Sequence, residues 1–446
     1  MALMEVVAVR KSAHTFALPS LSSRERVAAL IEIGGVMLRP VFAPATNRPG
    51  TLSLPSTSRL DRYLRVEVER ATALEIAAAL RARDDIETAY VKPLPLLPIA
   101  PRETALELAT PQIDRPIPDL SDGQGYRLSA PNGVDVQAAW ALLGGMGDGV
   151  RIIDIEGGWC LEHVDLEGNG GLSGGEAYPE FEWRNHGTAV LGIMIAENDA
   201  SGVRGLAPNA QGSAYTHRSF GAAGAIQRAA DLLSAGDILL LEMHSPGPRH
   251  DYELRDDQKG YIAVEWWPDT FDAIRYAIDR GIIVVEAAGN GAESLDDELY
   301  ETPDYYFPEG WQNPFRQRDS GAILVGAGAP ANALGTLPRS RLDFSNFGDR
   351  VDCQGWGGGV WSTGYGDLYV GAGEHQWFTD TFSGTSSASP IVAGALACVQ
   401  GVARARGTPL NPQRARQMVR DHGTDQQGPA ERIGKLPDLA KLIAAL

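Results

Sequence analysis

The chain has 446 residues, 43% of them hydrophobic and 22% charged, which is ordinary for a globular protein and long enough for two or three cores. Its 39 basic and 57 acidic residues give a formal charge of −18, which would repel phosphate backbones and anionic lipids. We therefore expect no nucleic acid and no membrane partner, whereas cationic or neutral peptides fit the charge better.

The opening residues, MALMEVVAVRKSAHTF, lack the continuous apolar core of a signal peptide, and no later segment has about 18 uninterrupted apolar residues. The three cysteines (Cys160, Cys353 and Cys398) cannot form a complete disulfide framework. These features predict a reducing, cytoplasmic location. A removed or replaced leader, or export by another route, would leave the same pattern.

Residues 1–92 alternate between strand and helix patterns. The predicted order is a strand at 5–10, a helix at 23–32, and then VMLRPVF (strand), RYLRVEVE (strand), TALEIAAALRA (helix) and IETAYVKP (strand). This β-α-β-β-α-β order is the split βαβ arrangement of a small α+β, ferredoxin-like domain.

Residues 93–134 are dense in proline, as in KPLPLLPIAPRE, and predict an extended linker that is open to proteolysis. From residue 135 to 446, short apolar strands alternate with helical segments. This alternation predicts an α/β domain with a parallel sheet covered by helices on both faces and a ligand site at the carboxyl ends of the strands.

Two carboxylates, Asp154 and Glu156, end the first apolar strand of this domain in VRIIDIEGGW. Because side chains alternate along a strand, both acids should lie on one face and repel each other. At least one of them needs a positive or hydrogen-bonding partner elsewhere in the chain.

Two further motifs supply candidates. NHGTAVLGIMIA places His186 just before or at the start of a helix, and FSGTSSASPIVAGALACVQ places Ser386 at the start of an apolar, buried helix. There the helix dipole stabilises an anion. Taken alone, a histidine at a helix start is usually a surface residue, and such a serine is more often a cap than a nucleophile.

The motifs DIEGG, NHGTAV, VVEAAGNG and FSGTSSASP occur in the order that resembles the subtilisin-like serine peptidases over roughly residues 135–425. The resemblance implies that Ser386 attacks the scissile carbonyl, that His186 transfers its proton, and that Asp154 orients His186. Asn290 matches the residue that stabilises the oxyanion. It also implies catalysis without a cofactor.

The chain departs from the family pattern at three glutamates. Glu156 stands where the family usually has glycine, and Glu242 and Glu286 interrupt strands that the family keeps apolar or neutral. Each could be a paired structural acid, but together they suggest an acidic site for a cationic substrate group. The chain also departs from the family at the edge strand that pairs with the substrate backbone, where it has His244, Ser245, Pro246 and Gly247.

The segment ENDASGVRGLAP resembles the loop of calcium-binding members of the family, with Asp199 and the earlier Asp165 as carboxylate ligands. An ordinary turn explains the same segment equally well. Structural calcium is therefore one of two open interpretations.

The position of residues 1–92 resembles that of the family's inhibitory propeptide, which would make this domain an intramolecular partner. It could instead stay attached and recruit another protein. We expect a serine endopeptidase. The alternatives are a catalytically impaired peptide-binding protein and an exopeptidase that anchors substrate N-termini on glutamates.

Overall fold

The computed structural model describes residues 3–11, 31–43, 60–98, 107–112, 115–301, 306–333, 335–428 and 430–446. In the N-terminal domain an antiparallel sheet has the order β2-β3-β4-β1-β5, with α3 packed against it. Its elements are β1 (Leu3–Arg10), β2 (Ile31–Ile33), β3 (Val36–Pro40), β4 (Tyr63–Glu69), α3 (Arg70–Arg81) and β5 (Ile86–Pro93).

Most of the predicted elements of this domain are confirmed, but the first helix is not. Most of the predicted helix at 23–32 lies outside the described residues, and Ile31–Ile33 form a strand instead. The reason is the turn that follows. Gly34 and Gly35 both have positive φ and close a two-residue hairpin that pairs Ile33 with Val36.

The larger domain is built on a seven-stranded parallel sheet of order β14-β13-β12-β9-β6-β8-β7, as the alternating pattern predicted. Its strands are β6 (Arg151–Glu156), β7 (Leu172–Gly174), β8 (Gln211–Thr216), β9 (Ile238–Leu241), β12 (Ile283–Ala287), β13 (Ile323–Gly328) and β14 (Cys353–Trp356).

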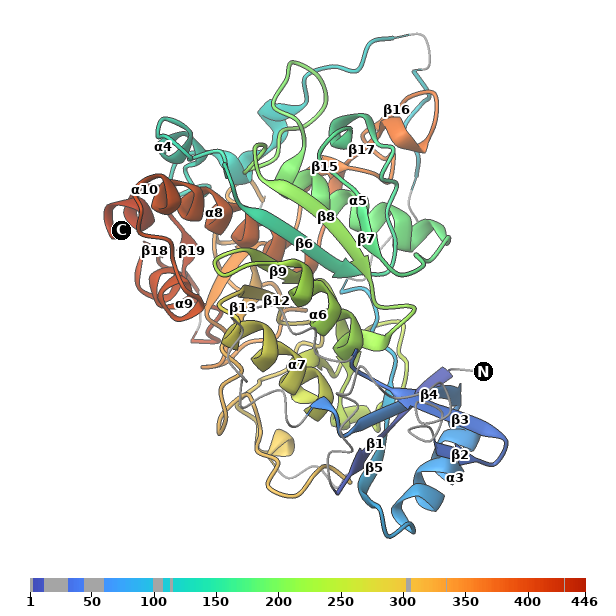
Figure 1. The fold of residues 1–446 in the computed structure, drawn as a ribbon. Helices are drawn as coiled ribbons and strands as arrows, with labels where there is room; N and C mark the ends of the chain where they lie inside the picture. The colour runs from blue at the N-terminus through green and yellow to red at the C-terminus, as the bar shows by residue number, and fades with distance from the viewer. Residues whose placement is uncertain are drawn as a thin grey trace.

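Helices cover both faces of this sheet (Figure 1). On one face α5 (Phe181–Ile195) and α8 (Thr385–Ala405) pack on Ile152, Leu240 and Val285. On the other face α6 (Gly221–Leu232) and α7 (Pro268–Asp279) pack on Ile153, Ile155 and Val284. The alternation of side chains along each strand therefore decides which helices a residue meets.

Helix α8 is the centre of the core. Among the described residues it is the one helix apolar and long enough to cross a bilayer, and that whole apolar stretch is buried inside the protein, as expected of a core helix. The remaining elements surround this framework: α4 (Val136–Trp140), β10 (His244–Pro246), β11 (Tyr261–Ala263), β15 (Val360–Thr363), β16 (Tyr369–Val370), β17 (Trp377–Phe382), α9 (Pro412–Asp421), β18 (Gly423–Thr424), β19 (Leu436–Pro437) and α10 (Leu439–Ala444).

The N-terminal domain packs beside α6 and α7 (Figure 1). In the contact, the ring of Tyr90 stacks on Trp267, and the ammonium group of Lys92 pairs with Asp269 at the start of α7. The chain that follows is not a free linker. Leu96 pairs with β10, and the backbone N–H of Ala109 donates to Gly366 O across 2.7 Å.

Candidate active site

The start of α8 places the predicted nucleophile. Gly384 has φ 113°, a conformation that glycine adopts without strain, and the chain turns there into the helix. Ser386 follows in the first turn, fully buried, where the helix dipole favours negative charge. Its Oγ donates a hydrogen bond to the backbone oxygen of Pro98 across 2.7 Å. The hydroxyl is therefore in contact with a peptide carbonyl.

Helix α5 carries His186, but it begins at Phe181, earlier than predicted, so the histidine lies in its second turn. The ring stands edge-on to Phe382 and is fully buried. His186 Nδ1 is 2.6 Å from Glu156 Oε2. Among the described residues its Nε2 has no hydrogen-bond partner, since the Ser386 hydroxyl is donated to Pro98.

The prediction that Asp154 is the partner of His186 is therefore wrong in this structure. Asp154 Oδ2 instead accepts from the indole Nε1 of Trp159 across 2.8 Å. The indole can approach because residue 187 is glycine: a Cβ there would clash with the Trp159 ring. With Asp154 held by Trp159, the next acid on the same strand face reaches the imidazole.

The two carboxyl groups lie on the same face of β6, close enough for each to shift the pKa of the other. Burial raises the pKa of Asp154 well above its ordinary value, and the neighbouring Glu156 raises it further. Burial likewise raises the pKa of Glu156. For His186 the same loss of water lowers the pKa to about 3, because the imidazolium is the charged form. All three pKa shifts favour neutral side chains, that is, protonated carboxyl groups and an uncharged imidazole.

Glu242, just past the end of β9, joins this cluster. It lies on the sheet face of Leu240 and Asp154, and its carboxyl group contacts the hydroxyl of Ser389 on α8. Burial raises the pKa of Glu242 well above its ordinary value, followed by the nearby Asp154 and Glu156. Glu242 is 0% exposed, so it presents no carboxylate at the surface of the cleft.

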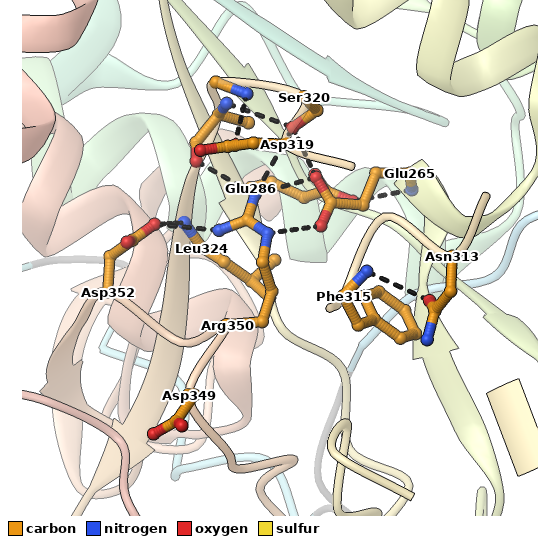
Figure 2. A network of polar contacts seen from close by, with 12 residues as sticks. Glu265, Glu286, Asn313, Phe315, Asp319, Ser320, Leu324, Asp349, Arg350 and Asp352 are labelled. Carbon is orange, nitrogen blue, oxygen red and sulfur yellow. Dashed lines mark hydrogen bonds and ion pairs between the residues drawn. The ribbon is translucent and has the colours of Figure 1, made fainter. Parts of the chain in front are cut away.

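Glu286 belongs to a different network, which corrects the idea that the three glutamates form one site. Its position on β12 points to the α6/α7 face, and its Oε1 accepts from the backbone N–H of Glu265 across 3.0 Å. Figure 2 shows this group around the buried Arg350, whose guanidinium bonds Glu265 across 2.7 and 2.8 Å and Asp352 across 2.9 Å. The role of Glu286 is therefore structural.

Asn290 lies beside the nucleophile. Its Oδ1 accepts from both the N–H and the hydroxyl of Thr385, each across 2.9 Å, and its amide Nδ2 donates to Gln258 Oε1 across 3.4 Å. The backbone N–H of Asn290 donates to His244 Nδ1 across 3.3 Å. Burial lowers the pKa of His244 to about 3, and a neutral ring is what this accepting nitrogen requires.

The edge formed by β10 holds the segment that follows the N-terminal domain. Leu96 N donates to His244 O across 2.9 Å, and His244 N donates to Leu96 O across 3.1 Å, which makes an antiparallel pair. Gln258 Nε2 donates to Leu97 O across 3.2 Å. The next carbonyl, that of Pro98, is the one at Ser386. A short strand of the chain itself thus occupies the cleft.

Of the four residues predicted to form the substrate edge, only His244 pairs with this strand. Ser245 and Pro246 pair with Ile262 and Tyr261 of β11, and the N–H of Gly247 donates to Gly260 O across 2.9 Å. These three residues build the hairpin behind the edge.

The predicted calcium ligands do not form an ion cage. Asp165 Oδ2 accepts from Val203 N across 2.8 Å, and Asp199 Oδ1 accepts from Ser201 N across 2.9 Å. The guanidinium of Arg204 donates to the backbone oxygen of Asp199 across 2.9 Å and so supplies positive charge to the loop. In the described part of the chain, no group of three or more His, Cys, Asp or Glu side chains is arranged to hold a metal ion. In this structure both carboxylates are used in hydrogen bonds to the backbone, and calcium binding at this loop stays a prediction.

Three contacting residues were not singled out from the sequence: Trp159, Ser389 and Gln258. Trp159 and Ser389 lie within the quoted motifs EGGW and GTSSASP, three residues after Glu156 and Ser386. Gln258 lies in a loop with no motif of its own, and nothing in its sequence context marks it.

Comparison with known proteins identifies the family of this chain. The model of the subtilase family matches residues 162–434, a segment that includes His186, Asn290 and Ser386 and begins after Glu156. The chain is 28% identical over 370 residues to an alkaline protease of Alkalihalobacillus alcalophilus, covering 80% of each. It is 30% identical over 305 residues to subtilisin BL of Lederbergia lenta, covering 66% of this chain and 90% of that protein.

Two solved structures share the fold. The epidermin leader peptide processing protease of Staphylococcus aureus has a TM-score of 0.58 at 19% identity, covering 99% of this chain and 98% of that one. Fervidolysin of Fervidobacterium pennivorans has a TM-score of 0.56 at 18% identity, covering 100% of this chain and 61% of that one. With its family match, its relatives and its fold in agreement, the chain belongs to the subtilase family of serine peptidases.

Proposed function

We propose that this peptidase is an endopeptidase that uses Ser386 as nucleophile, His186 as general base and Glu156 as the acid that orients His186. Ser386 Oγ attacks the scissile carbonyl while His186 Nε2 takes its proton, and the same proton then goes to the leaving amine. Water repeats the sequence on the acyl-enzyme and releases the acid product. The Asn290 amide and the Ser386 backbone N–H stabilise the oxyanion, and no cofactor takes part.

The observation that carries the proposal is the contact between Ser386 Oγ and Pro98 O, in a strand paired with His244. We infer that this strand lies in the cleft as a substrate would. The bond presented to Ser386 is Pro98–Ile99, and the N-terminal domain acts as an inhibitor until this bond is cut and the domain is released.

The strand bound at Ser386 favours the endopeptidase over the exopeptidase, because it is an internal segment of the chain. The bound strand comes from β5 on one side, and beyond Pro98 the chain resumes in the described part at residues bonded to Gly366 and Val370. Glu156 and Glu242 are both buried and bonded to His186 and Ser389, so neither anchors a substrate N-terminus. The residues in the cleft, Leu96 to Pro98, are apolar, which gives the cationic-substrate hypothesis no support.

Intact mass spectrometry of purified wild-type protein and Ser386→Ala tests the proposal. We expect the wild type to yield a fragment that begins at Ile99, and the variant to stay whole. After the Pro98–Ile99 bond has been cut and the N-terminal domain has been released, Ser386 should react with a fluorophosphonate. A wild-type chain that stays whole and does not react would identify an impaired, peptide-binding member of the fold.

A further inference from the structure

Three carboxyl groups and one imidazole are buried close together at the base of the site. Asp154, Glu156, Glu242 and His186 are each 0% exposed. Apart from one another, their described side-chain partners are neutral groups, the Trp159 indole and the Ser389 hydroxyl. Three negative charges here would be balanced by at most one imidazolium. An uncompensated buried charge costs several kcal/mol, about as much as the stability of many domains, so protons must remain in the cluster.

The hydroxyl of Ser389 locates one of these protons. Its Oγ contacts Glu242 Oε1 and also lies 2.7 Å from the backbone oxygen of Thr385, one turn back in α8. A hydroxyl has one proton to donate, and both neighbours are acceptors if Glu242 is ionised. Both contacts become hydrogen bonds when Ser389 donates to Thr385 and a protonated Glu242 donates to Ser389.

The orientation of His186 locates a second proton. For Nε2 to take the proton of Ser386, Nδ1 must carry a hydrogen and donate it, so Glu156 Oε2 must accept. Trp159 already donates to Asp154 Oδ2. The oxygens left without a hydrogen-bond partner among the described residues are Asp154 Oδ1 and Glu156 Oε1, and the two side chains lie on the same face of β6. One proton on Asp154, donated to Glu156, satisfies both.

We propose that Asp154 and Glu242 are positioning residues that remain protonated in the active enzyme, so that Glu156 is the single carboxylate behind His186. Asp154 uses one oxygen to accept from Trp159 and the other to donate to Glu156. Glu242 donates to Ser389 and thereby fixes the first turns of α8 below Ser386. This inference rests on the proposed function, since it assigns the protons of that same site.

Charged groups on the surrounding elements do not replace these protons. Glu182, on the exposed side of α5, raises the pKa of His186 only in part against burial. Burial keeps His244, beyond β9, neutral. His217, after β8, has Glu5 and Arg65 as its charged neighbours. Asp154 and Glu156 therefore titrate as a pair with two apparent pKa values. Activity should appear when the pair loses its first proton and decline when it loses the second, because two adjacent charges displace Glu156 from His186.

Isosteric amides distinguish the two acids. The amide introduced by Asp154→Asn can still accept from Trp159 and donate to Glu156, so this variant should keep kcat/KM within about tenfold and should lose the decline at high pH. The amide introduced by Glu156→Gln carries no charge to stabilise the imidazolium, and the equivalent change in a Ser-His-Asp triad costs about 10⁴-fold in kcat. We expect Glu156→Gln to lose about 10³- to 10⁴-fold. Glu242→Gln should also keep kcat/KM within about tenfold but should retain the decline at high pH, because the Asp154–Glu156 pair is unchanged.

The opposite pattern, with Asp154→Asn losing about 10³-fold or more and Glu156→Gln nearly active, would overturn the inference. Retention of the high-pH decline in Asp154→Asn would do the same. An inactive wild type that does not react with fluorophosphonate would instead overturn the proposed function, so the two failures are distinguishable. Two controls show that a variant is folded: it yields the same self-cleavage fragments as the wild type, and it unfolds on heating at a similar temperature.

A measurement that needs no activity keeps the inference testable if a variant is poorly folded. Infrared spectra of the Ser386→Ala chain at neutral pH should contain absorption of protonated carboxylic acids. Adding Asp154→Asn, and separately Glu242→Gln, should each remove one such contribution, whereas Glu156→Gln should not. Unchanged spectra in both of the first two would show that these acids are ionised and would overturn the inference.

Discussion

At the scale of single residues, the side chain that binds the strand differs from the side chain that stabilises the oxyanion. Gln258 touches the strand in the cleft at Leu97 O, whereas Asn290 has its amide N–H₂ beside the nucleophile and its oxygen fixed by Thr385. The amide of Asn290 is thus positioned before the reaction, which is the condition under which a donor stabilises a developing charge most effectively.

This geometry predicts that Asn290→Ala lowers kcat by about 10²- to 10³-fold with little change in KM, the size of effect known for an oxyanion donor of subtilisin. Gln258→Ala should act mainly on KM, because its contact with Leu97 O is already formed in the bound state, with a smaller loss of kcat because Gln258 Oε1 also accepts from the Asn290 amide. Steady-state kinetics on a peptide ending in Leu-Leu-Pro before the cut would measure both. Equal effects of the two substitutions on kcat would contradict the assignment.

At the scale of elements, the contact of β5 with α7 holds the N-terminal domain in place. Lys92 Nζ pairs with Asp269 and lies 3.1 Å from Glu5 Oε2, and Tyr90 donates to Asp269 Oδ1 across 3.0 Å. Lys92 and Asp269 are 3% and 0% exposed. Removing one member of a buried pair leaves the other charge uncompensated, which costs about 3–5 kcal/mol.

We therefore expect the domain to stay bound after the Pro98–Ile99 bond is cut, and Lys92→Met to release it about 10²- to 10³-fold more readily. Native mass spectrometry of the cut protein would measure the bound fraction. Arg83→Met is the matched control, because Arg83 pairs with Asp85 in an exposed position and such pairs contribute little. Similar release from both variants would show that the buried pair does not hold the domain.

The elements that carry the site could largely be predicted. Strand β6, the turn into α8 and the loop after β12 end in recognisable motifs, and their order along the chain is the order expected. What could not be predicted is the pairing of Leu96 with His244, because a proline-rich segment has no local signal for the edge that it will meet.

At the scale of the whole molecule, buried acids and buried histidines give stability opposite dependences on pH. The buried acids other than Glu156 keep their protons in the folded state, so they lower the free energy of unfolding as pH rises above their ordinary pKa values. The histidines are neutral when folded, so they lower it as pH falls below about 6.5. Burial raises the pKa of five acids, to about 8 for Asp165; the others are Asp154, Glu156, Glu242 and Glu286. Burial lowers the pKa of four histidines to about 3 or 4, namely His163, His186, His217 and His244.

The two dependences oppose each other between about pH 4.5 and 6.5, and only the acids act above that range. We expect the free energy of unfolding of the Ser386→Ala chain to be nearly constant between about pH 4.5 and 6.5 and then to fall by about 1.4 kcal/mol per pH unit for each retained proton. Asp165→Asn should reduce the slope between about pH 6.5 and 8. Denaturant unfolding across this range would measure it, and stability that rises above pH 7 would contradict the assignment.

The sequence by itself determined the two-domain order, the α/β class and the positions of Ser386, His186 and Asn290, because these follow from periodicity and from motifs that are contiguous in the chain. Only the tertiary structure decided that Glu156 rather than Asp154 meets His186, and that Glu286 lies on the opposite face of the sheet. Alternation along β6 gives Asp154 and Glu156 the same face and so cannot choose between them. The choice depends on Trp159, which reaches Asp154 across the space left by Gly187, and such contacts arise only when distant segments pack.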